Sequence, residues 1–117
     1  MSDPSQDGPQ SAADFLRLGW VFHGKSNEIA AEENFRKAIS LSPALIDAFY
    51  GLGLTLKAQG RRQEAAKTFG EVISLLDTDI SIDRTRRAIL RRLTLGHINL
   101  LESGDWGLEK EIWKHTA

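Results

Sequence analysis

Apolar side chains recur at spacings of three and four residues along most of the chain, which is the period of an amphipathic helix. Short polar segments that contain glycine, serine, asparagine or proline separate the periodic stretches, and these residue types favour turns. The pattern therefore predicts an all-α protein. The expected helices cover residues 12–23, 28–41, 43–59, 61–76, 82–102 and 106–115.

Residue types at several predicted helix ends support these ranges. Ser11 and Asp14 have the spacing of a capping box, in which two side chains satisfy backbone N–H groups at a helix start. Pro43 suits a first helical position, because the N–H group that it lacks would be unpaired there. Gly60 can end a helix in the left-handed conformation. Residues 1–11 are polar and aperiodic, so we expect a flexible tail.

The chain repeats itself at a fixed interval, which is the distance along the sequence from Phe15 to Phe49. The earlier members of the matched pairs are Phe15, Leu18, Gly19, Ala31, Phe35 and Ala38, and their counterparts are Phe49, Leu52, Gly53, Ala65, Phe69 and Val72. Self-similarity at a fixed period is typical of proteins that stack helix pairs. We expect the small residues to lie where two helices cross closely, with Phe35 and Phe69 filling the grooves between neighbouring pairs.

This repeat resembles the tetratricopeptide repeat, whose common pattern is Trp-x2-Leu-Gly-x2-Tyr, then Ala-x3-Phe, then proline. Both copies match the order and the spacing, with phenylalanine in place of the tryptophan, although Asp77 stands where the second proline is expected. The matching residues are Phe15, Leu18, Gly19, Phe22, Ala31, Phe35 and Pro43 in the first copy, and Phe49, Leu52, Gly53, Leu56, Ala65 and Phe69 in the second. The resemblance implies a right-handed solenoid of antiparallel helix pairs.

A third copy is degenerate. Leu95-Gly96 and Gly104 resemble the leucine-glycine and turn segments, but the two glycines lie one residue further apart than Gly53 and Gly60. We interpret this copy as a lengthened helix followed by a short capping helix, because an atypical terminal repeat can end a stack. The predicted repeats are 12–43, 44–77 and 78–117, within one domain over 12–117. In the lengthened helix the main apolar stripe is Ile82, Ile89, Leu93 and Leu100, with Leu90, His97 and Leu101 beside it.

The resemblance also implies a concave groove lined mostly by the first helix of each pair. Those helices carry a second stripe beside the packing stripe, at spacings of i, i+4 and i+7. We predict that this stripe binds a partner, and it contains Leu16, Trp20, His23, Tyr50, Leu54 and Lys57. Family members that clamp a terminal carboxylate have lysine and asparagine there, so the apolar residues favour a hydrophobic or helical ligand. The alternative is that the stripe packs beneath the tail or between helices.

Two hypotheses for function follow. In the first, the chain is an adaptor or scaffold that holds a segment of a different protein in the groove. In the second, the chain is a self-associating structural subunit of a homo-oligomer or larger assembly. The copies would then be joined by the same stripe or by the last helix, through Trp106, Ile112 and Trp113.

A secondary basic face is predicted on the helix over 82–102, where Arg84, Arg87 and Arg91 share one stripe. It could bind an acidic protein segment or phosphates. The alternative is a solvated face with local pairing, such as Asp83 with Arg87. A formal net charge of −1 argues against nucleic acid as the partner, because phosphate binding normally accompanies a basic domain.

Composition excludes several chemistries. The chain has no cysteine, its three histidines lie far apart, and no glycine-rich phosphate loop is present. We therefore expect no enzyme, cofactor or metal site, and we interpret His97 as a hydrogen-bonded core histidine. The N-terminus lacks the features of a signal peptide, and no apolar run approaches the roughly 20 residues that span a bilayer. We expect a cytoplasmic protein.

Overall fold

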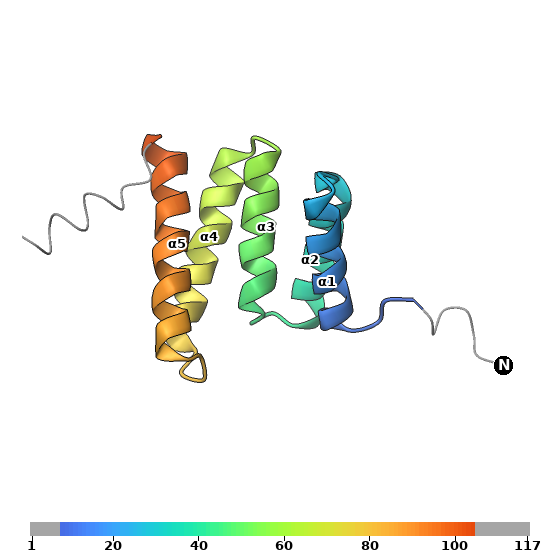
Figure 1. The fold of residues 1–117 in the computed structure, drawn as a ribbon, viewed down its shortest axis with the longest axis horizontal. Coiled ribbons are helices and arrows are strands. Elements are labelled where there is room, and N and C mark those ends of the chain that lie inside the picture. The colour runs from blue at the N-terminus through green and yellow to red at the C-terminus, as the bar shows by residue number, and fades with distance from the viewer. Residues whose placement is uncertain (1–7, 105–117) are drawn as a thin grey trace, which may run out of the picture.

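The computed structural model describes residues 8–104, which form five helices that stand side by side (Figure 1). Their bounds are Ala12–Gly24 for α1, Glu28–Leu41 for α2, Ile46–Ala58 for α3, Arg62–Thr78 for α4 and Arg84–Ser103 for α5. Residues 8–104 contain no strand, and each helix packs against the next. The predicted helical solenoid is confirmed, whereas the helix expected over 106–115 lies outside the described residues.

The predicted helix ends are confirmed at two places and wrong at a third. Ser11 and Asp14 form both hydrogen bonds of the capping box at the start of α1. Gly60 has a φ of +77° and follows Gln59, the C-cap of α3. Pro43, however, does not start a helix, because α3 begins at Ile46. Pro43 instead lies inside a turn that the Leu45 N–H closes by donating to the Ser42 carbonyl, and the fixed φ of proline suits such a turn equally well.

Two phenylalanines hold the helix pairs together, as the repeat predicts. Phe35 and Phe69 have no exposed surface. A Cβ atom placed on Gly19 would lie 2.6 Å from the Phe35 ring, and one placed on Gly51 would lie 2.4 Å from the same ring. Gly53 stands in the same relation to Phe69, at 2.6 Å. Phe35 therefore contacts both the first helix of its own pair and the first helix of the next pair.

The face of α5 that the structure buries is not centred on the main apolar stripe of its sequence. Ile89 is 57% exposed and Leu93 is 39% exposed, although both belong to the main apolar stripe of the helix pattern. The buried residues of α5 are Thr94, Gly96 and Leu101. The difference arises because α5 packs on α4 through the face that contains Leu90, Ile98 and Leu101, with His97 stacked on the Phe69 ring. This orientation leaves one apolar edge of α5 uncovered.

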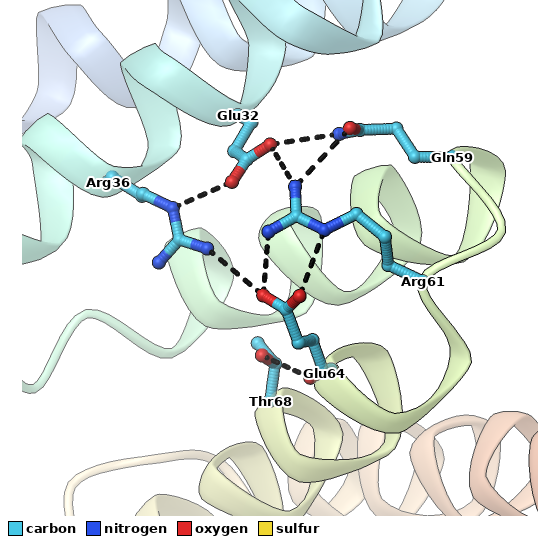
Figure 2. A network of polar contacts seen from close by, with 6 residues as sticks. All are labelled: Glu32, Arg36, Gln59, Arg61, Glu64 and Thr68. Carbon is cyan, nitrogen blue, oxygen red and sulfur yellow. Dashed lines mark hydrogen bonds and ion pairs between the residues drawn. The ribbon is translucent and has the colours of Figure 1, made fainter.

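A network of polar and charged side chains joins the α1–α2 pair to the α3–α4 pair (Figure 2). Glu32 on α2 accepts hydrogen bonds from Arg36 at 2.9 Å, from Gln59 at 3.0 Å and from Arg61 at 2.6 Å. Arg61 also donates to Glu64 on α4. Burial opposes ionisation of Glu32, but these hydrogen bonds outweigh it and lower the pKa of the carboxyl group. The network thus links α2 to the turn between α3 and α4.

Candidate functional site

An open apolar groove of about 480 Å³ lies across helices α1, α3 and α5. Trp20 of α1 and Tyr50 of α3 form one side of it, and α5 forms the other. The lining residues are Trp20, Asp47, Tyr50, Asp83, Thr85, Arg86, Ile89, Leu90 and Leu93. Helices α1, α3 and α5 thus all contribute to one concave surface, which is where the repeat predicts a binding site.

The apolar edge of α5 is the part of the groove that the sequence interpretation missed. Ile89 and Leu93 are one helical turn apart and are the large exposed apolar residues of this surface. An alignment of the third copy with the first two would have predicted that Leu93 lies on this surface. When Gly96 is aligned with Gly53, Leu93 falls on Tyr50, which already falls on Leu16. The additional residues at the end of α4 and at the start of α5 hide this register, because they break the fixed interval that relates the first two copies.

Charged groups at one end of the groove compensate one another. The guanidinium of Arg86 lies 3.2 Å from one carboxylate oxygen of Asp47. Asp83 is the N-cap of α5, where its side chain accepts a hydrogen bond of 3.1 Å from the backbone N–H of Arg86. A carboxylate at this position is also stabilised by the helix dipole. The groove therefore has an apolar centre and a polar end that is already paired.

The six residues of the predicted partner-binding stripe have different surroundings. Trp20 and Tyr50 line the groove, and the Trp20 ring also packs edge-on against Phe35. Leu16 and Leu54 are partly buried against the main core cluster. The side chain of His23 is hydrogen-bonded to that of Glu28, with 2.8 Å between Nδ1 and the carboxylate oxygen. Lys57 contacts His97 and is described next. The structure thus brings Trp20 and Tyr50 of the stripe into the groove lining.

Tyr50 belongs to a short chain of polar side chains that runs from α3 to α5 and back. The hydroxyl of Tyr50 lies 3.2 Å from Nε2 of His97, and the ammonium of Lys57 lies 3.2 Å from Nδ1 of the same ring. Burial, and then the positive charge of Lys57, lower the pKa of His97 from 6.5 to about 4. Burial also raises the pKa of Tyr50. His97 is thus hydrogen-bonded, as interpreted from the sequence, but its ring is half-buried against Phe69 and does not lie fully in the core.

The three arginines of the predicted basic face do not share one environment. Arg84 is exposed on the first turn of α5. Arg87 donates through its guanidinium to the backbone carbonyl of Asp79, and Arg91 forms an ion pair with Asp77. Asp83 caps the helix through the Arg86 N–H. Two of the three cations therefore tie α5 to the end of α4 and the turn that follows.

Within residues 8–104, no cluster of three histidine, aspartate or glutamate side chains is arranged to hold a metal ion. No helix of the same part of the chain combines the length and the apolar character that a membrane span requires.

Comparison with known proteins agrees with the geometry. The family model for the tetratricopeptide repeat matches residues 15–45 and 46–75, which together are more than half of the chain. These segments correspond to the α1–α2 and α3–α4 pairs. No curated protein and no solved structure matches the chain. Repeats of this family are generally protein–protein interaction modules. The chain belongs to the tetratricopeptide repeat family.

Proposed function

We propose that this chain is an adaptor that binds an apolar, helical segment of a partner protein in the groove formed by α1, α3 and α5. The observation that carries this proposal is the apolar edge of Ile89 and Leu93 opposite Trp20 and Tyr50. Large aromatic and aliphatic side chains in one hollow are the usual anchors of protein interfaces. The chain then acts by binding and not by catalysis.

The shape of the groove favours a helix as the occupant. Three helices line the surface, and apolar residues one turn apart on α5 match the i, i+4 anchors of an amphipathic helix laid against it. A strand would need an exposed sheet edge, and residues 8–104 contain no sheet. The paired charges of Asp47 and Arg86 suit the polar rim of such an interface.

The test compares three forms of the chain as bait in a lysate of its native host. The groove variant combines Ile89→Glu with Leu93→Glu, and the matched control is Ile29→Glu on α2, where the side chain is 78% exposed outside the groove lining. Proteins enriched by the native chain are then purified and titrated against all three forms by calorimetry. Circular dichroism checks that the variants are folded.

The proposal predicts a partner that binds the native chain and the Ile29→Glu control equally and binds the groove variant at least tenfold more weakly. Each apolar anchor contributes about 1 kcal/mol or more when its remaining exposed surface is buried, and an introduced carboxylate adds a desolvation cost. A partner that retains full affinity for the groove variant contradicts the proposal. Enrichment of the chain by itself, with loss of self-association in the groove variant, favours the structural-subunit hypothesis instead.

A further inference from the structure

Tyr50, His97 and Lys57 form a chain of hydrogen bonds, and the chemistry of these three groups determines which of them donates in each bond. A lysine ammonium can only donate hydrogen bonds, so Nδ1 of His97, 3.2 Å from Lys57, must be the acceptor. The ring is neutral at pH 7, because burial and Lys57 lower its pKa to about 4. A neutral imidazole carries one proton, which must therefore sit on Nε2.

This tautomer sets the role of the tyrosine. The Nε2–H group of His97 donates to the Tyr50 oxygen at 3.2 Å, so the phenolic proton does not point at His97. Within residues 8–104, His97 is the hydrogen-bond partner that the structure gives to this hydroxyl. Tyr50 therefore keeps one donor for an acceptor that enters the groove it lines. The positive charge of Lys57, relayed through the ring, polarises this donor.

We propose that Tyr50 is the specificity-determining donor of the groove, and that the bound helix carries one side-chain oxygen acceptor (Glu, Asp, Gln or Asn) among its apolar anchors. This inference rests on the proposed function and adds the chemistry of the partner. A buried donor that finds no acceptor in the complex is costly, so the groove selects against a wholly apolar helix.

The local charges favour the same kind of ligand. Asp47 is compensated by Arg86, and Asp83 by the N-terminus of α5. Lys57 has no carboxylate within ion-pair distance among residues 8–104, so its charge is not neutralised by the chain described. The field at the Tyr50 hydroxyl therefore attracts an oxygen and repels a lysine or arginine.

Lys57 acts as a positioning residue in this scheme, since it lies outside the groove lining and works through His97. In Lys57→Met the hydrogen bond from the ammonium group to Nδ1 is lost, and the opposite tautomer, in which Nε2 accepts from Tyr50, becomes more favourable. The groove would then lose its donor although every lining residue is unchanged. Lys67→Met on the exposed face of α4 is the matched control for removal of a lysine.

The experiment uses a display library of short helical peptides with randomised residues on one face. Peptides selected on the native chain are measured against Tyr50→Phe, Lys57→Met and Lys67→Met. The selected peptides are expected to contain one acceptor residue, and its replacement by leucine should weaken binding to the native chain roughly three- to tenfold. That penalty should vanish in Tyr50→Phe and Lys57→Met and persist in Lys67→Met. Nitrogen NMR of His97 should show the Nε2–H tautomer in the native chain and its loss in Lys57→Met.

The outcomes separate this inference from the proposed function. An Nδ1–H tautomer in the native chain overturns the donor assignment without any peptide. Peptides that require Leu93 but bind Tyr50→Phe with the same acceptor penalty leave the groove as the site and overturn the role of Tyr50. If no selected peptide depends on Ile89 or Leu93, the groove is not the binding site and both proposals fail.

Discussion

Replacement of Gly51 by alanine tests the stacking of the two regular pairs at a single atom. The added Cβ would lie 2.4 Å from two carbons of the Phe35 ring. Such a distance is far too short for a carbon–carbon contact, so either the ring or α3 must shift. Phe35 has no exposed surface, and its ring also lies against Gly19, so it has little room to move. Overpacking of this kind costs about 1–3 kcal/mol, and the tight geometry favours the upper part of that range.

The measured effect of Gly51→Ala will combine this cost with a gain. Alanine in a helix interior is favoured over glycine by roughly 1 kcal/mol. Gly70, in the interior of α4, provides the matched control, since a Cβ there would meet no atom within 4 Å. Gly70→Ala should therefore stabilise the fold by about 1 kcal/mol, whereas Gly51→Ala should destabilise it. The difference between the two variants isolates the steric cost, about 1–3 kcal/mol.

Urea unfolding followed by circular dichroism measures this difference. With an m-value of about 1–2 kcal/mol/M for a chain of this size, the midpoints of the two variants should lie about 0.5–3 M apart. Phe35→Leu should reduce the cost of Gly51→Ala, because the smaller side chain removes the clash, and it should leave the stabilisation by Gly70→Ala unchanged. Equal stabilisation by Gly51→Ala and Gly70→Ala would refute the close approach of α3 to Phe35 and, with it, the account of how the pairs stack.

Three further predictions concern individual interactions. Ser11→Ala removes the capping box of α1 and should lower the free energy of unfolding by about 1 kcal/mol, which denaturant titration would detect. His97 has a folded-state pKa of about 4, below its ordinary 6.5, so the unfolded chain takes up a proton first and stability falls as pH drops from 6.5 towards 4. After allowance for solvent around a half-buried ring this amounts to roughly 1–2 kcal/mol, and His97→Gln should flatten the profile between pH 6.5 and about 5. Glu32→Gln should lower stability by about 0.5–1 kcal/mol more than Glu33→Gln at the exposed neighbouring position, and equal thermal midpoints would contradict the network of Figure 2.

The repeated part of the fold was predictable because each matched position has one dominant physical requirement. A glycine against a phenylalanine ring, as at Gly53 and Phe69, leaves few alternatives, so period and residue type agree. The start of α3 was not predictable from Pro43, because proline suits both a first helical position and a turn. Only the hydrogen bond from Leu45 to Ser42 distinguishes the two.

The face of α5 shows where periodicity alone is insufficient. This helix has apolar residues on more than one side, so the period cannot say which stripe meets α4. The structure buries Thr94 and leaves Ile89 and Leu93 exposed, and it is tertiary packing on α4 that makes this choice. The place of Trp20 and Tyr50 in the groove lining could be predicted from sequence, because the fixed interval of the repeat aligns the first two helix pairs. Leu93 is the corresponding residue in the third copy, but its separation from Tyr50 along the sequence differs from the separation of Tyr50 and Leu16.

The most direct test of the groove is an amide and indole NMR map of the isotopically labelled chain titrated with the tightest peptide from the display selection. The account predicts the largest shift changes at the Trp20 indole and at Tyr50, Ile89 and Leu93, with Ile29 on α2 unaffected. Changes concentrated instead at the far end of α4 and α5, around Arg62 and Leu101, would contradict it and place the binding site on a different surface.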